Sequence, residues 1–246
     1  MKKIIYIFGI FIVLGGLAFV TLNTFTEIST QPVNQISLSN TNQNFDSEDM
    51  IQLPEPTTDG KVSLEKALTL RRSIRNYSNE ALSLEDISQL LWSAQGITNE
   101  RGFRTAPSAG ATFPLEMFVV ANNVEGLSKG IYHYSPFEIT LEVIHLKDIA
   151  AELMRASHSQ SMIAESAVVL VFGAVFERTT DRYGERGIRY VHNEIGHASQ
   201  NVHLQAAAMD LGTVVIGAYR DEEVEEILDL DPDIRVLYMM PVGKLK

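Results

Sequence analysis

The chain has 246 residues, 45% of them hydrophobic, a formal net charge of −11 and no cysteine. This length holds one sizeable globular domain with extensions, and the acidic balance argues against a non-specific nucleic-acid binder, which needs a basic face. The lack of cysteine excludes disulfides, thiol catalysis, cysteine-ligated zinc and iron–sulfur clusters.

Residues 1–23 are predicted to form a membrane anchor or a signal segment. Lys2 and Lys3 precede an uncharged apolar run from Ile4 to Leu22, which at about 1.5 Å per residue spans the roughly 30 Å hydrocarbon layer of a bilayer. The run is longer than the usual core of a cleaved signal peptide, and no A-x-A-like site follows Ala18. We favour an uncleaved anchor over a cleaved signal that would release the protein. Both place the rest of the chain outside the cytoplasm, because the two lysines stay inside.

Residues 24–52 are rich in Asn, Gln, Ser and Thr, with only scattered apolar side chains. Such a segment buries too little apolar surface to offset its ordering entropy, so it is predicted to be a flexible linker. A folded domain is expected over residues 53–246.

Within this domain, helices and strands are predicted to alternate irregularly. Ser63 is the expected N-cap of the first helix, and Ser83 opens a capping box for a second helix that Gly96 closes. Further helical patterns cover 148–156, 161–165, the middle of 182–211 and 222–228. Strands are predicted at 115–121, 130–134, 139–145, 168–176, 213–218 and 236–242. The pattern predicts an α+β fold, a mixed sheet flanked by helices.

The long helix within 182–211 combines an apolar stripe with many polar, uncharged side chains. Val191, Ile195, Val202 and Ala206 recur near the helical period, and small residues such as Gly196 would let a second helix approach closely. Such a helix sits between subunits or beside a ligand. The alternative, an ordinary amphipathic helix with a wet face, is equally compatible with the composition.

A cluster of basic residues follows the first helix. Arg71, Arg72 and Arg75 surround Ser73, and guanidinium groups bind phosphate through paired, charge-assisted hydrogen bonds. If the helix continues, Arg71 and Arg75 share one face. The alternative is that basic residues simply suit the C-terminal end of a helix.

A loop of small residues precedes the first predicted strand, and its candidate ligand-contacting residues are Pro107, Ser108, Ala109 and Gly110. Such residues let the backbone approach a flat ligand, although an ordinary turn has the same composition. Gly217 follows a predicted strand, where its backbone N–H could contact a ligand. Lys244 and Lys246 could add positive charge to an anion site or belong to a simple tail.

The histidines do not predict a metal site. His192 and His197 are five residues apart, about 140° around a helix, so they do not share a face. The sequence also contains no G-x-S-x-G elbow, no P-loop and no G-x-G-x-x-G motif.

Together these stretches resemble the nitroreductase superfamily, and within it the SagB-type dehydrogenase branch, from about residue 53 to residue 243. The motifs that carry the resemblance are RRSIRNY (71–77), APSAGATFPLE (106–116), RYGERGIRYVHNEIGHASQN (182–201), IGAYRDEEV (216–224) and MMPVG (239–243).

The resemblance implies a homodimer that binds one FMN in each of two clefts built by both subunits, with the long helix, including His197, Gln200 and Asn201, at the dimer interface. It assigns the phosphate and ribityl chain to Arg71, Arg72, Ser73 and Arg75, with Lys244 or Lys246 closing on the phosphate. It places Pro107 to Gly110 of the partner subunit along the isoalloxazine, and Ile216 and Gly217 near its N5.

The resemblance also suggests Arg182 and Tyr183 as the catalytic pair, although azoline-oxidising members carry lysine where this chain has arginine, which stays protonated and makes a poor base. The expected activity is hydride transfer through FMN between NAD(P)H or an organic substrate and a small-molecule acceptor. The alternative is a degenerate flavin fold that serves as a membrane-tethered binding or scaffold module.

Overall fold

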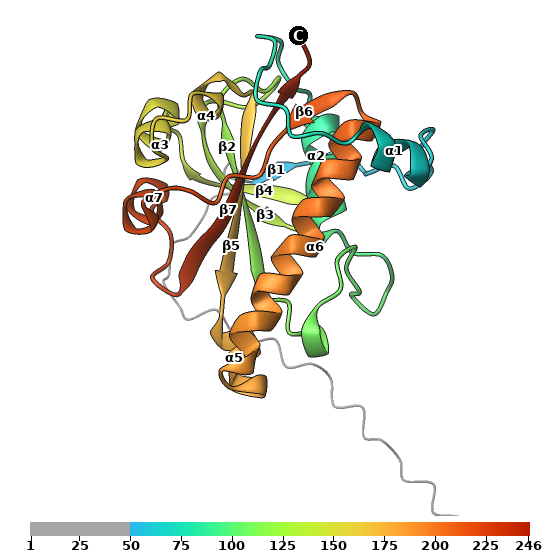
Figure 1. The fold of residues 1–246 in the computed structure, drawn as a ribbon, viewed down its shortest axis with the longest axis vertical. Coiled ribbons are helices and arrows are strands. Elements are labelled where there is room, and N and C mark those ends of the chain that lie inside the picture. Colours follow the sequence, from blue (N-terminus) through green and yellow to red (C-terminus); the bar gives the residue numbers. More distant parts are fainter. Residues whose placement is uncertain (1–49) are drawn as a thin grey trace, which may run out of the picture. The chain divides into compact units, whose positions relative to one another are not determined.

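A computed structural model describes residues 50–246, and these form a seven-stranded sheet with helices on both faces (Figure 1). The strand order is β1-β4-β3-β2-β5-β7-β6. The strands are β1 Met50–Gln52, β2 Leu115–Ala121, β3 Gly130–Ser135, β4 Thr140–His145, β5 Val168–Val175, β6 Leu211–Thr213 and β7 Ile234–Lys244. All pairings between these strands are antiparallel. Parallel pairing enters through the isolated bridges Ser73–Thr213 and Leu82–Val124.

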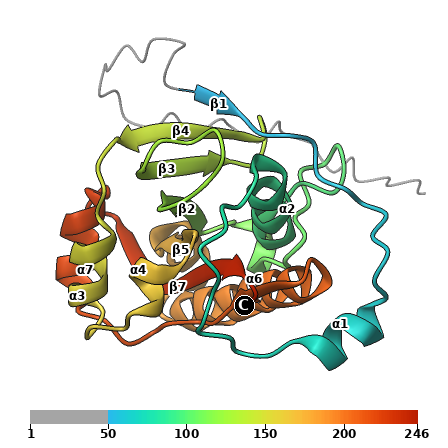
Figure 2. The same cartoon turned by 90° about the horizontal axis from the view of Figure 1, so that it is seen from above.

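The helices divide between the two faces of the sheet, as Figure 2 shows from above. They are α1 Leu64–Leu70, α2 Leu84–Gln95, α3 Ala150–Ala156, α4 Met162–Glu165, α5 Glu177–Tyr183, α6 Arg186–Ala208 and α7 Asp221–Leu228, with a 3-10 turn η1 at Ala109–Ala111. The helices α2 and α6 form one hydrophobic core with the sheet, and α3, α4 and α7 form a second core on the opposite face. The α1 helix stands apart at the side, with Leu64 and Leu68 exposed.

The predicted strand at 168–176 is confirmed as β5, and it is buried along nearly its whole length between β2 and β7. The helix predicted in the middle of 182–211 is confirmed as α6. Its apolar stripe packs on the sheet, with Val191, Val202 and Ala206 fully buried. Both predicted helix starts are also confirmed, because Ser63 caps α1 and Ser83 forms a capping box with Asp86.

Several predicted boundaries were wrong. Residues 50–52, assigned to the linker, form β1, which pairs with β4. The sheet therefore begins at residue 50, before the predicted start of the domain at residue 53. The strand predicted at 213–218 is β6 at 211–213 followed by a single bridge between Ile216 and Met239. A separate helix that the sequence left unassigned, α5, carries Arg182 and Tyr183 in its last turn, and Gly184, with a positive φ of 57°, ends it.

The predicted anchor at 1–23 and residues 24–49 of the predicted linker lie outside the described residues. Over residues 50–246, no helix is long and apolar enough to cross a membrane.

Candidate functional site

The predicted catalytic pair and the loop of small residues come together in one chain. Arg182 Nη1 donates a hydrogen bond of 2.9 Å to the Gly110 carbonyl. A Cβ on Gly110 would lie 2.4 Å from the Tyr183 hydroxyl oxygen, and the φ of Gly110 is 62°. Glycine is therefore required here both by the backbone conformation and by the close approach of Tyr183.

The loop contains residues other than glycine with positive φ, and hydrogen bonds from neighbouring side chains hold it in this conformation. Ala111 and Phe113 have positive φ values of 54° and 45°, which cost on the order of 1 kcal/mol each outside glycine. The Phe113 N–H donates to the Ser108 hydroxyl at 3.0 Å, and Arg178 donates to the Phe113 carbonyl at 3.1 Å. Strain maintained by several contacts is typical of a segment whose shape matters for function.

The basic cluster is extended rather than helical. The α1 helix ends at Leu70, and Arg71 takes φ −51° and ψ 121°. The helix therefore does not continue, which was the condition for Arg71 and Arg75 to share a helix face. Ser73 instead forms a parallel bridge with Thr213 at the edge of the sheet, and the Ile74 N–H donates to the Thr213 carbonyl at 2.9 Å.

In an extended segment, successive side chains point to opposite faces of the sheet. Ile74 lies against Gly212, whereas Arg71 is close enough to His203 of α6 to lower its pKa. Arg71 and Ser73 therefore face the side that carries α6. The Arg72 guanidinium folds back on the backbone and donates to the carbonyls of Thr69 and Arg71. None of the three arginines forms an ion pair with another described residue.

The C-terminal lysines reach the same sheet edge. Lys244 is paired with Leu211 at the end of β7, and its carbonyl accepts a hydrogen bond from the Ser78 N–H. The Lys244 ammonium lies 3.8 Å from the Glu80 carboxylate in an exposed pair, which contributes little to stability and leaves the lysine available. Lys246 is exposed at the end of the chain.

Two buried polar atoms next to this segment have no partner among the described residues: Nδ1 of His203, which is near Arg71, and Oγ1 of Thr213, which pairs with Ser73. Burial, with a further contribution from Arg71, lowers the pKa of His203 to about 4, so its ring is neutral at physiological pH. Buried polar atoms are normally paired. Their position near the Arg71 guanidinium fits a ligand that carries hydroxyl and phosphate oxygens.

Ile216 and Gly217 lie farther along the same edge. Ile216 exchanges two backbone hydrogen bonds with Met239, of 2.8 and 3.0 Å. Gly217 is exposed, and a Cβ there would lie 3.3 Å from the Tyr238 ring. Because Ile216 follows Thr213 by three residues, the two are about 10 Å apart along the edge.

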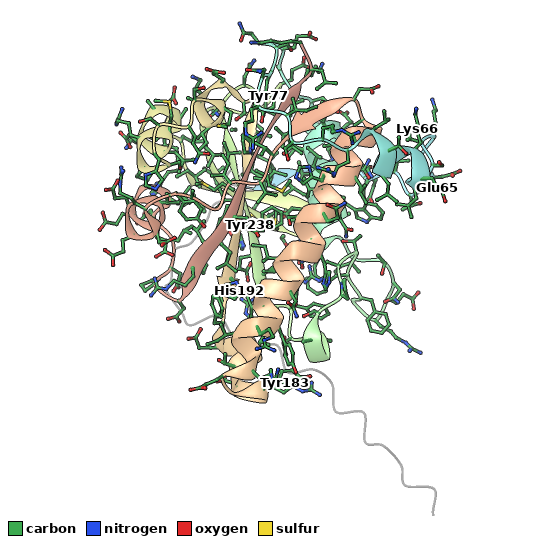
Figure 3. The ribbon with its side chains drawn as sticks, viewed as in Figure 1. Glu65, Lys66, Tyr77, Tyr183, His192 and Tyr238 are labelled. Carbon is green, nitrogen blue, oxygen red and sulfur yellow. The ribbon has the colours of Figure 1, made fainter. Side chains whose placement is uncertain are left out.

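The predicted site residues therefore form two groups in one chain. The loop group contains Pro107 to Gly110 with Arg182 and Tyr183, and the edge group contains Arg71, Ser73, Ile216, Gly217 and Lys244. Between them runs α6, whose length from Arg186 to His203 is about 25 Å. Figure 3 shows Tyr183 and Tyr77, which adjoins the edge group, at opposite ends of the molecule. One chain alone does not bring the two groups together.

Glu194 and Arg104 were not predicted as site residues. Glu194 is 3% exposed on α6, next to Ser108 and Arg104 of the loop before β2, and its Oε1 has no partner among the described residues. Burial raises its pKa to about 7, against the opposing effects of Ser108 and Arg104, which favour the charged form. The signal in the sequence was a carboxylate beside Val191 and Ile195, within an apolar stripe.

Over residues 50–246, no three histidine, aspartate or glutamate residues group closely enough to hold a metal ion. His192 and His197 both lie on the exposed side of α6, and the His192 ring contacts Phe176 edge-on at 5.6 Å. A cavity of about 450 Å³ between Trp92 and the turn at Phe137 includes no predicted site residue.

The seven-stranded sheet with helices on both faces defines an α+β protein. The chain belongs to the nitroreductase family of oxidoreductases, whose sequence profile matches residues 68–244.

A candidate nitroreductase of Methanocaldococcus jannaschii is 44% identical over 194 residues, which cover 79% of this chain and 96% of that protein. The microcin B17-processing protein of Escherichia coli is 30% identical over 156 residues, 61% of this chain and 57% of its own length. The expected SagB-type relatives are thus present.

Among solved structures, a candidate nitroreductase from Ralstonia eutropha superposes with a TM-score of 0.71 at 27% identity, covering 82% of this chain and 92% of the other. A chain of the E. coli microcin synthetase complex reaches a TM-score of 0.62 at 25% identity, covering 78% and 76%.

Proposed function

We propose that this protein is an FMN-dependent oxidoreductase that works as a homodimer. The observation that carries the proposal is the edge group. Arg71 lies near His203, Ser73 pairs with Thr213, both of these partners carry a buried atom unpaired among the described residues, and Lys244 lies on the same border of the sheet. Cations and hydroxyl-binding atoms at one end, and the open backbone of Gly217 about 10 Å away, suit a ligand with a phosphate, a polyol chain and a flat ring.

The separation of the two groups supports the dimer. If two copies pack through α6 in antiparallel directions about a twofold axis, the loop group of one chain lies beside the edge group of its partner. Gly196 lies one residue from the middle of α6, is exposed, and has open space where a Cβ would be. A glycine at that crossing point would allow close approach.

In this arrangement Arg71, Ser73 and Lys244 would hold the phosphate, and Gly217 would contact the ring. Bound FMN would supply the redox chemistry by accepting a hydride from NAD(P)H or an organic substrate and passing it on. Arg182 would position the Gly110 carbonyl through its hydrogen bond. The Tyr183 hydroxyl would orient the substrate or donate a proton to it.

The direct test is to purify the full-length chain and measure its flavin content. Stoichiometric FMN that bleaches with a chemical reductant supports the oxidoreductase. A colourless protein that refuses added FMN contradicts the proposal and favours the scaffold alternative.

We predict that Arg71→Ala weakens FMN binding by roughly ten- to a hundredfold, because it removes a charge-assisted hydrogen bond to the phosphate. Titration of flavin fluorescence measures the change. Arg101→Ala is the matched control, since Arg101 is an exposed arginine on a different loop. Equal affinities of the two variants would remove Arg71 from the phosphate site.

We further propose that residues 1–23 anchor the protein in the membrane, with the domain outside the cytoplasm. The uncharged run after Lys2 and Lys3 supports this. We expect the protein in the membrane fraction after alkaline carbonate washing, and its domain accessible to protease in spheroplasts. Release by carbonate would contradict the anchor.

A further inference from the structure

Glu194 is a carboxylate that is buried without a full set of hydrogen-bond partners within residues 50–246. It lies on the side of α6 that faces the loop group, it is 3% exposed, and one of its oxygens has no partner among the described residues. An unpaired buried polar group costs about 1–3 kcal/mol. No step of the proposed function uses it.

The groups that face this carboxyl come from the loop that precedes β2. Ser108 and Arg104 both favour the charged form of Glu194, while burial opposes it. Arg104 is itself partly buried and donates to the Gln95 carbonyl at 2.9 Å. On α6 itself, Asn201 donates to the Thr105 carbonyl at 3.3 Å. The loop therefore rests on α6 through Glu194 and Asn201, and Glu194 alone of these two can change its charge.

Ser108 connects Glu194 to the strained part of the loop. Its hydroxyl oxygen accepts a hydrogen bond from the N–H of Phe113, a residue with positive φ. Ser108 is close enough to Glu194 to favour its charged form, and an ionised carboxylate can only accept, so it offers the Ser108 hydroxyl an acceptor. When Glu194 is protonated, its own O–H needs an acceptor. The Ser108 hydroxyl would then have to accept a hydrogen bond from Glu194 and could no longer only donate to it.

We propose that Glu194 is a positioning residue, whose gain or loss of a proton changes how the loop from Ser108 to Phe113 is held and so how it presents its backbone to the cleft. The consequence for the cleft rests on the proposed function; the effect on the loop does not. The pKa of about 7 means that both states of Glu194 are populated near neutral pH.

The experiment uses the full-length chain, its Glu194→Gln variant, which keeps the shape of the side chain but cannot ionise, and Glu185→Gln as control. Glu185 is an exposed glutamate at the start of the same helix. Amide hydrogen exchange of residues 108–113, corrected for the intrinsic effect of pH, is followed from pH 5.5 to 8.5, and FMN affinity is titrated over the same range.

In the wild-type chain and in Glu185→Gln, we expect loop protection to change at least roughly threefold with a midpoint near pH 7, and FMN affinity to follow it. In Glu194→Gln both should be independent of pH. A transition that persists in Glu194→Gln, or no transition in the wild-type chain, overturns the inference. If no chain binds FMN, the proposed function fails, whereas the exchange measurement still decides the role of Glu194.

Discussion

At the scale of single residues, Glu194 makes a stability prediction that needs no ligand. Burial raises its pKa from 4.5 to about 7 in the folded protein. The folded state therefore loses stability as pH rises above 4.5, where the unfolded chain ionises freely, and the loss levels off above about pH 7.

Glu194→Gln removes this penalty. We expect the variant to be more stable than the wild-type chain by about 1–2 kcal/mol at pH 8 and equally stable near pH 4.5. Urea denaturation at the two pH values measures the difference. A gain of the same size at both values would mean that packing, and not ionisation, is responsible.

Sequence reasoning predicted a phosphate site at Arg71, Ser73 and Lys244, because guanidinium groups beside a serine suit phosphate in any local conformation. The structure brings Ser73 and Lys244 to one border of the sheet, and their role in binding stays a prediction. It did not find the roles of Glu194 and Arg104. Their importance comes from contacts between α6 and a loop about 90 residues earlier in the chain, and no short-range pattern encodes that distance.

At the scale of elements, the corner between α5 and α6 depends on a second glycine. A Cβ on Gly187 would lie 2.9 Å from backbone atoms of Thr180, which cannot move without shifting α5. We predict that Gly187→Ala destabilises the protein by about 2 kcal/mol. The same change at Gly196 meets open space and should stabilise the isolated chain by up to about 1 kcal/mol. Thermal unfolding of both variants tests the contrast.

The elements that sequence reasoning found were long or strongly patterned, such as β5, α2 and α6. Those it misjudged depend on partners distant in the chain. Residues 50–52 become a strand only because β4 offers a free edge, and residues 71–77 leave the helix because Ser73 and Tyr77 pair with the edge of the sheet.

At the scale of the whole molecule, the separation of the loop group and the edge group predicts that assembly and cofactor binding depend on each other. Gly196→Leu places a bulky side chain at the proposed crossing point of the two α6 helices. We expect this variant to be monomeric and to lose most of its FMN, while the fold of each chain remains.

Light scattering and flavin content measure the two effects together. Ile188→Ala is a milder control, because it trims an exposed side chain near the end of the same helix. A monomeric variant that keeps a full complement of FMN would show that one chain is sufficient for binding.

The position of β1 in the sheet determines where a force applied to the preceding part of the chain would act. The domain starts at β1, on the outer side of β4, whereas the arginines and Lys244 gather at β6, on the far border of the sheet. A pulling force applied upstream of Met50 would first peel the short β1–β4 ladder, with five strands still standing between the load and β6. If the proposed anchor holds the protein at a membrane, its pull would act on the border of the sheet farthest from the arginines.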